Sequence, residues 1–181
     1  MKAGDYMVHV FLEKVKEINI PEGATSVDPM VTVETLGQKQ FSSAKDDVGG
    51  VGEVTYGEHI FLEAKNIDKE KAEGSKIVLK LMDKGMFKDC LIGEFEFDLS
   101  FIYLKKDHVM LHQWIALSNP HGDNWADISC YMKVSISVSV TGDEQVEIKE
   151  EEEEPEDVKV IMSPALNPSF YQIKIRIFAG E

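Results

Sequence analysis

A period of two dominates the order of apolar and polar residues along this chain. Over residues 131–140, apolar residues stand at every second position, namely Met132, Val134, Ile136, Val138 and Val140. Successive side chains of a strand point to opposite faces, so this pattern predicts a half-buried β-strand. Seven further segments have strand character, at residues 8–12, 30–36, 38–42, 59–64, 77–81, 93–97 and 113–117. Breaks rich in Gly, Asn and Asp separate them, which predicts an all-β fold, an eight-stranded antiparallel β-sandwich.

One segment departs from the strand pattern. Residues 98–106 predict a short helix between two late strands, with Asp98 or Ser100 as the N-cap. Lys105 and Lys106 would lie in its last turn, where they complement the helix dipole. This helix is expected as an insertion within the sandwich, not as a second domain.

The charge is concentrated near the end of the chain. The 181 residues carry a net charge of −14, of which −9 falls on residues 143–157. A segment so polar cannot bury enough apolar surface to fold alone. We therefore predict a folded domain over residues 1–142 and an acidic, largely disordered linker over residues 143–167.

The last segment, residues 168–181, contains another alternating strand at residues 170–178. Two interpretations are open for this strand. It either pairs with an edge of the sandwich or forms the first strand of a following, truncated domain. We favour the second interpretation.

Several classes of function find little support in the composition. The two cysteines, Cys90 and Cys130, form no disulfide framework or zinc motif, which favours a reducing, intracellular compartment. The apolar runs have the length of strands, and no secretory signal stands at the start. The five histidines are scattered along the sequence without a nucleophile in a recognisable turn, so no enzyme and no small-molecule substrate is expected. An acidic chain without a basic face also argues against binding to nucleic acid.

Three separated stretches resemble C2 domains. Residues 28–33 (Asp-Pro-Met-Val-Thr-Val) resemble the strand opening of those domains, and residues 53–61 resemble a loop and strand of theirs. Residues 91–98 (Leu-Ile-Gly-Glu-Phe-Glu-Phe-Asp), together with residues 114–120, are similar to a stretch of the ferlins. The resemblance covers residues 5–143 and implies an internal C2 domain of a ferlin, followed by an acidic linker and the first strand of the next C2 domain. It also implies the C2 permutation that begins one strand later.

The resemblance also implies a set of calcium ligands in two loops. Asp28, Asp83 and Asp89 match acids of the C2 pattern, and Glu22 stands where the pattern has another Asp. Ca²⁺ takes six to eight oxygen ligands, and the number of carboxylates tunes its affinity. Gly85 replaces one acid of the pattern, so Ca²⁺ binding is predicted to be weak or absent.

The third loop also suggests a membrane contact. Met86 and Phe87 stand between Lys84 and Lys88. Exposed apolar residues can enter the headgroup region while lysines meet anionic phosphates. The alternative is that Phe87 folds back into its own loop.

These features predict a docking module rather than an enzyme. The expected parent is a multi-C2 protein at the cytosolic face of membranes, anchored outside this segment and active in vesicle trafficking and membrane fusion. Its expected partners are anionic phospholipid surfaces, neighbouring C2 domains or other proteins. The alternative is a Ca²⁺-independent structural domain that packs against neighbouring C2 domains without lipid or metal.

Overall fold

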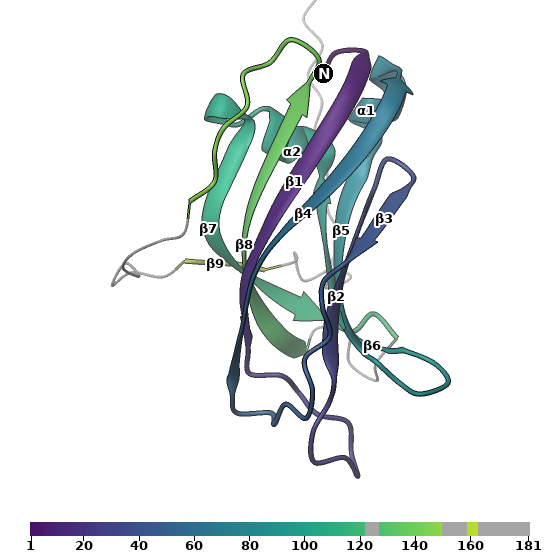
Figure 1. The fold of residues 1–181 in the computed structure, drawn as a ribbon, viewed down its shortest axis with the longest axis vertical. Helices are drawn as coiled ribbons and strands as arrows, with labels where there is room; N and C mark the ends of the chain where they lie inside the picture. Colours follow the sequence, from purple (N-terminus) through teal and green to yellow (C-terminus); the bar gives the residue numbers. More distant parts are fainter. Residues whose placement is uncertain (122–126, 150–158, 163–181) are drawn as a thin grey trace, which may run out of the picture.

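The computed structural model describes residues 1–121, 127–149 and 159–162. These residues form nine strands and three short helices (Figure 1). In chain order the elements are β1 (Gly4–Lys16), β2 (Pro29–Thr35), β3 (Gln38–Phe41), β4 (Glu53–Ile67), α1 (Lys69–Glu73), β5 (Lys76–Asp83), β6 (Cys90–Asp98), α2 (Leu99–Tyr103), the 3-10 helix η1 (Lys106–His108), β7 (Val109–Ser118), β8 (Ile128–Val140) and β9 (Val160–Met162).

The first eight strands form two four-stranded layers that close on one another. One layer has the order β3-β2-β5-β6 and the other has the order β7-β8-β1-β4. A single residue pair, Glu94 with Ser118, joins β6 to β7. All pairings within these eight strands are antiparallel, which confirms the predicted eight-stranded sandwich. The first strand pairs with both β8 and β4.

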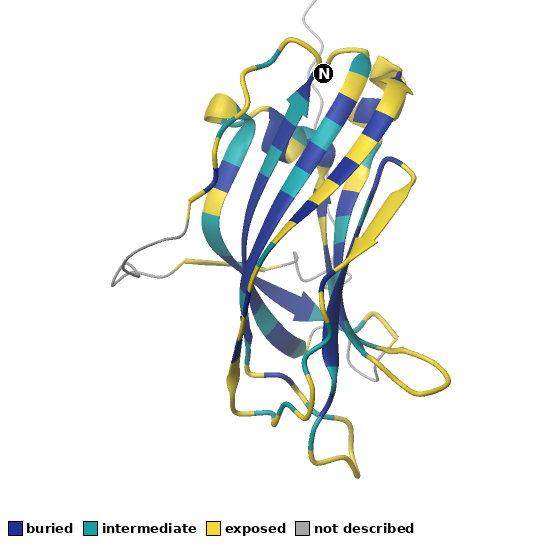
Figure 2. Ribbon diagram, in the orientation of Figure 1, coloured by how far each residue is buried: buried dark blue, intermediate teal, exposed yellow. Residues whose placement is uncertain are grey.

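The core lies between the layers and follows the predicted alternation (Figure 2). Met132, Val134 and Ile136 of β8 are completely buried, as predicted. On the opposite face of that strand, however, Ser135 is also completely buried. Its hydroxyl donates a hydrogen bond to Glu13, at 3.0 Å, and accepts one from the backbone of His112. Both partners stand where β1 and β7 shift register, so irregular neighbouring strands bury a face that the period-two pattern assigns to solvent.

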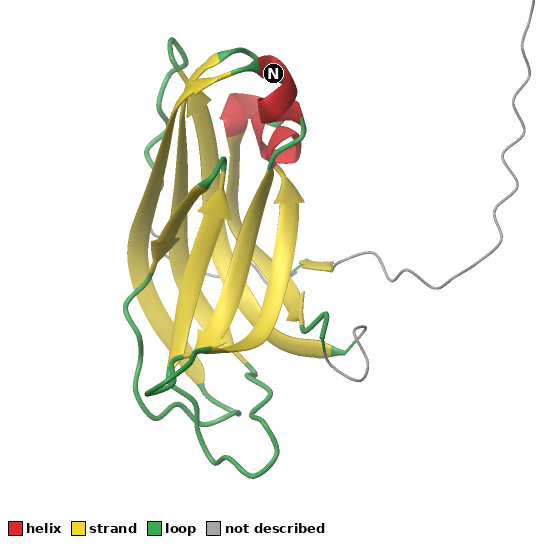
Figure 3. Ribbon diagram, turned by 90° about the vertical axis from the view of Figure 1, so that its right-hand side faces the viewer, coloured by secondary structure: helices red, strands yellow, loops and turns green. Residues whose placement is uncertain are grey.

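The helices lie together at one end of the sandwich (Figure 3). Helix α2 confirms the predicted helix between two late strands, and Asp98 occupies the N-cap position without a hydrogen bond from its side chain. The helix ends at Tyr103, so Lys105 and Lys106 lie beyond its last turn, contrary to the prediction. Helix α1 was not predicted from the sequence. Its N-cap is Asp68, whose carboxylate accepts a hydrogen bond from the backbone N–H of Lys71 at 2.6 Å. Residues 69–73 are mostly good helix formers and are followed by Gly74, which is a readable signal for a short helix.

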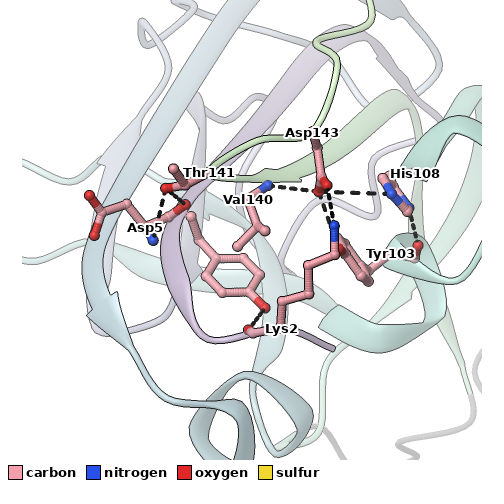
Figure 4. A network of polar contacts seen from close by, with 8 residues as sticks. Lys2, Asp5, Tyr103, His108, Val140, Thr141 and Asp143 are labelled. Carbon is pink, nitrogen blue, oxygen red and sulfur yellow. Dashed lines mark hydrogen bonds and ion pairs between the residues drawn. The ribbon is translucent and has the colours of Figure 1, made fainter.

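A polar network closes the sandwich at this end, which we call the closed end (Figure 4). Asp143 lies at its centre, and its side chain is only 6% exposed. The carboxylate accepts hydrogen bonds from the Lys2 ammonium at 2.7 Å, the Tyr103 hydroxyl at 3.1 Å and the Val140 backbone N–H at 3.1 Å. Burial alone would raise the pKa of Asp143, but these hydrogen bonds outweigh it and hold the pKa below its usual value.

The described parts of the predicted linker lie against the sandwich. Ile148 is 6% exposed. Strand β9 adds in parallel to β7, and the Gln113 side chain donates a hydrogen bond to the Lys159 carbonyl oxygen. The centre of the acidic run and the strand predicted at residues 170–178 lie outside the described residues. The division of this segment into a linker and a following domain therefore stays a prediction.

Candidate functional site

Three loops gather at the end of the sandwich opposite the helices (Figure 1). The first loop, residues 17–28, joins β1 to β2. The second loop, residues 42–52, joins β3 to β4, and the third loop, residues 84–89, joins β5 to β6. We call this the loop end. All residues predicted to bind Ca²⁺ or a membrane lie in these loops or at their borders.

The first and third loops are joined by hydrogen bonds at their two predicted metal ligands. The Asp83 carboxylate accepts a hydrogen bond from the backbone N–H of Asp28 at 2.8 Å. The Lys84 backbone N–H donates to the Asp28 carbonyl oxygen at 2.9 Å. Asp28 and Asp83, which are 55 positions apart in the sequence, are thus brought into contact.

The second loop joins the same junction. One oxygen of the Asp28 carboxylate accepts a hydrogen bond from the backbone N–H of Asp47 at 2.8 Å. Val27 and Val48 exchange two backbone hydrogen bonds beside it, at 3.0 and 2.9 Å. Each of the two carboxylates therefore gives one oxygen to hold neighbouring loops together, which leaves fewer lone pairs for a cation.

The other two predicted ligands are placed differently. Glu22 and Asp89 are both exposed, in the first and third loops. Among the described residues, no three His, Cys, Asp or Glu side chains lie close enough to hold a metal ion. The four-residue calcium site therefore stays a prediction.

Sequence reasoning overlooked the acids of the second loop. Asp46 and Asp47 are both exposed, and the backbone of Asp47 is bonded to the Asp28 carboxylate. A readable signal was present, because this acidic pair precedes the Gly-rich residues 49–52 between two strands. The loop that contains these acids lies at the same end of the sandwich as the first and third loops, so its acids could have been included among the candidates.

The third loop is tightly folded at Gly85. A Cβ atom at this position would lie 2.1 Å from the Lys88 carbonyl oxygen, far inside van der Waals contact. Gly85 stands where the C2 pattern has an aspartate. The shape of this loop therefore leaves no room for the missing ligand, and the departure from the pattern is structural as well as chemical.

Large apolar side chains cover the tip of the loop end. Met86 is 91% exposed and Phe87 is 98% exposed, so Phe87 points into solvent and not back into its loop. Val51, on the second loop, is 99% exposed. Lys84 and Lys88 are also exposed on either side of the third loop's tip. This end combines apolar tips with cationic flanks.

Comparison with known proteins agrees with this architecture. No family model matches the chain. The chain is 31% identical over 120 residues to myoferlin of Xenopus tropicalis, a match that covers 66% of the chain and 6% of that relative. The chain is a C2 domain of the ferlin family. Human myoferlin is 26% identical over 144 residues, which cover 79% of this chain and 6% of that protein.

Solved structures support the fold of this ferlin C2 domain. A structure of extended synaptotagmin 2 that holds its SMP domain and two C2 domains matches with a TM-score of 0.57 and 18% identity, over 76% of this chain and 26% of that one. A C2 domain-containing protein from a putative elicitor-responsive gene matches with a TM-score of 0.55 and 18% identity, over 81% of this chain and 98% of that one. At such identities the likeness shows the fold alone, so the chemistry of this ferlin C2 domain depends on its own residues.

Within this ferlin C2 domain, the departures from the C2 pattern fall in the loops. Gly85 and Glu22 lie in the third and first loops, whereas the strands keep the C2 arrangement. No helix among the described residues is long and apolar enough to cross a bilayer. The chain spans about 6% of the length of the curated relatives that it matches.

Proposed function

We propose that this ferlin C2 domain is a membrane-docking module of a larger multi-C2 protein that acts at the cytosolic face of membranes in vesicle trafficking and membrane fusion. The observation that carries the proposal is the tip of the third loop. Phe87 and Met86 are almost fully exposed there. Leaving large apolar side chains in water is unfavourable, and burying them in a membrane interface removes that cost.

The charge around the tip supports an anionic surface as the partner. Lys84 and Lys88 flank the two apolar residues. Each lysine near an anionic leaflet contributes about 1 kcal/mol of attraction. The domain as a whole is acidic, so this local pair of cations orients the loop end toward anionic lipid.

Calcium has a minor role in this proposal. Asp28 and Asp83 already use one carboxylate oxygen each for backbone N–H groups of neighbouring loops. The tight turn at Gly85 excludes a further aspartate. We propose Asp28, Asp83, Asp89 and Glu22 as weak ligands at most, so that docking proceeds largely without Ca²⁺.

A second candidate function is supported at the closed end. Phe101 and Leu104, on and just after α2, are 45% and 76% exposed. Lys105 lies over the Phe101 ring at 4.5 Å from its centroid. This patch suits a protein partner such as a neighbouring C2 domain, which is the alternative of a Ca²⁺-independent interaction domain.

Liposome cosedimentation separates the two functions. Replacing Met86 and Phe87 by Ser should weaken binding to phosphatidylserine vesicles by about tenfold or more, because each partly inserted apolar side chain contributes about 1 kcal/mol. The Tm should stay unchanged, because both side chains are exposed. Leu104→Ser is the matched control, since it removes an exposed apolar residue at the opposite end.

Each outcome of this experiment is informative. Equal binding by the wild type and the loop variant would reject the membrane role of the loop end. Loss caused by Leu104→Ser alone would move the docking surface to the closed end. Repeating the assay with Ca²⁺ and with chelator, on the Asp28→Asn and Asp83→Asn double variant, tests the metal: a strong Ca²⁺ effect that this variant abolishes would show a functional calcium site.

A further inference from the structure

Two histidines meet on the outer face of the β7-β8-β1-β4 layer, away from both ends of the sandwich. His9 lies on β1 and His59 on the neighbouring strand β4, 50 positions apart in the sequence. They are diagonal neighbours, since His9 pairs with Phe61 and Phe11 pairs with His59. Nε2 of His9 and Nδ1 of His59 are joined by a hydrogen bond of 2.8 Å, in which one ring donates its N–H to the other. A metal ion bound by both nitrogens would replace this proton, which the donor ring would carry on its other nitrogen.

Aromatic rings hold both imidazoles in place. The His9 ring stacks on Phe61, with centroids 4.2 Å apart and planes inclined by 15°. The His59 ring stacks on Phe11, with centroids 4.3 Å apart and planes inclined by 17°. Phe11 is buried and His59 is exposed, so the pair packs on the sheet on one side and is open to solvent on the other. Such fixed orientation reduces the cost of ordering two ligands around an ion.

The separation of the nitrogens suits one particular coordination angle. Metal–imidazole bonds of about 2.0–2.1 Å place two nitrogens about 2.9 Å apart at a right angle and about 3.4 Å apart at a tetrahedral angle. The observed 2.8 Å agrees with the right angle. Right angles between ligands are characteristic of the tetragonal geometry of Cu²⁺ and Ni²⁺, and imidazole is a good ligand for both.

We propose that His9 and His59 form a two-imidazole binding site for a divalent transition-metal ion, with Cu²⁺ preferred over Ni²⁺ and Zn²⁺. Water completes the coordination, because no third His, Cys, Asp or Glu among the described residues lies close enough to join the pair. The ion would link β4, the outermost strand of its layer, to β1. Hard cations such as Ca²⁺ prefer oxygen, so this site is independent of the loop end.

The surroundings add negative charge beside the pair. Glu144 and Asp107 line a small cavity beside His9 and Phe61 and add negative charge near a bound dication.

Copper titration of the full chain tests the site. The background is Cys90→Ser, because the exposed Cys90 thiol would compete for a soft metal. Cu²⁺ should give an electron paramagnetic resonance signal with nitrogen couplings from two imidazoles, and excess Ca²⁺ should not displace it. The same ion should raise the Tm, because it binds the folded state.

Variants decide whether the pair is responsible. His59→Phe removes the nitrogen but keeps a ring to stack on Phe11, and it should weaken Cu²⁺ binding by about tenfold or more, because the fold holds the second imidazole at a high effective concentration. His121→Gln, an exposed histidine elsewhere, should leave binding unchanged. Should His59→Phe lower the metal-free Tm, His59→Asn provides a second test with a smaller side chain.

The proposal is overturned by a one-imidazole signal, by a signal from oxygen ligands alone, or by unchanged affinity in the His59 variants. An oxygen-only signal would assign the ion to the acidic residues near the end of the chain. None of these outcomes affects the membrane assay, in which no transition metal is present.

Discussion

The two ends of this sandwich use carboxylates in different ways. At the closed end, Asp143 is buried and receives three hydrogen bonds, one of them from an ammonium group. At the loop end, Asp28 and Asp83 also hold backbone N–H groups, but they are half-exposed, and Phe87 of the third loop is almost fully exposed. The closed end therefore contributes stability, whereas the loop end keeps apolar and acidic groups accessible. Binding surfaces belong to the less stable parts of a domain, so this contrast agrees with docking through the loop end.

The largest expected effect is a loss of stability on replacing Asp143, and it tests whether the two ends have different roles. Asp143→Ala should lower the free energy of unfolding by about 2–3 kcal/mol, because it leaves the Tyr103 hydroxyl and the Val140 N–H without their acceptor. Chemical denaturation measures this loss, and liposome binding by the folded variant should not change. Asp89→Ala is the matched control, since it removes an exposed aspartate at the loop end. Equal destabilisation by both variants would contradict the division of roles between the ends.

The strands could be predicted because their signal is local. The alternation over residues 131–140 appears directly in the buried residues of β8, and the helix after Asp98 stands where the strand pattern stops. Asp143 was assigned to a linker because the acids that follow it dominate the local composition. Its role depends on Lys2, 141 positions away, which no local pattern reveals.

The candidate site could be predicted only in part, for a similar reason. The positions of Asp28 and Phe87 in loops, and of Asp83 at the end of a strand, follow from the predicted strands around them. The partners of their side chains depend on how three loops meet, and the contact between Asp28 and Asp47 is set by that meeting. The pair formed by His9 and His59 depends on the register between β1 and β4, which periodicity alone leaves open.

A second prediction sharpens the comparison at the loop end. Gly85→Asp, which restores the acid of the C2 pattern, should cost about 2 kcal/mol of stability, because any Cβ at this position collides with the Lys88 carbonyl oxygen. It should weaken liposome binding by moving Met86 and Phe87, and it should not create Ca²⁺ binding. Calorimetry with Ca²⁺ and thermal melts measure both effects.

Two controls separate backbone crowding from charge. Gly85→Ala should destabilise the domain nearly as much, because the collision involves the Cβ atom. Gly49→Asp adds an acid to the neighbouring second loop at a position with no heavy atom within 4 Å, so it should cost much less. Tight Ca²⁺ binding by Gly85→Asp with unchanged stability would show that the third loop rearranges freely, contrary to this account.

The smallest expected effect is a change of stability with pH, which distinguishes the contribution of the outer sheet face from that of the closed end. Burial is the main cause that lowers the pKa of His9 from 6.5 to about 4, so the unfolded chain takes up this proton before the folded chain does. The contribution of His9 is therefore fully present above pH 6.5 and is lost as the pH falls toward 4. After allowance for the partial exposure of the ring, the loss should be about 1–2 kcal/mol.

Asp143 should respond in a different pH range from His9. Its pKa lies below the usual 3.8, so its contribution should be lost only in more acidic solution. In Tm measurements against pH, His9→Gln should remove the first decline and keep the second, and Asp143→Ala should do the reverse. An unchanged first decline in His9→Gln would show that a group other than His9 causes it.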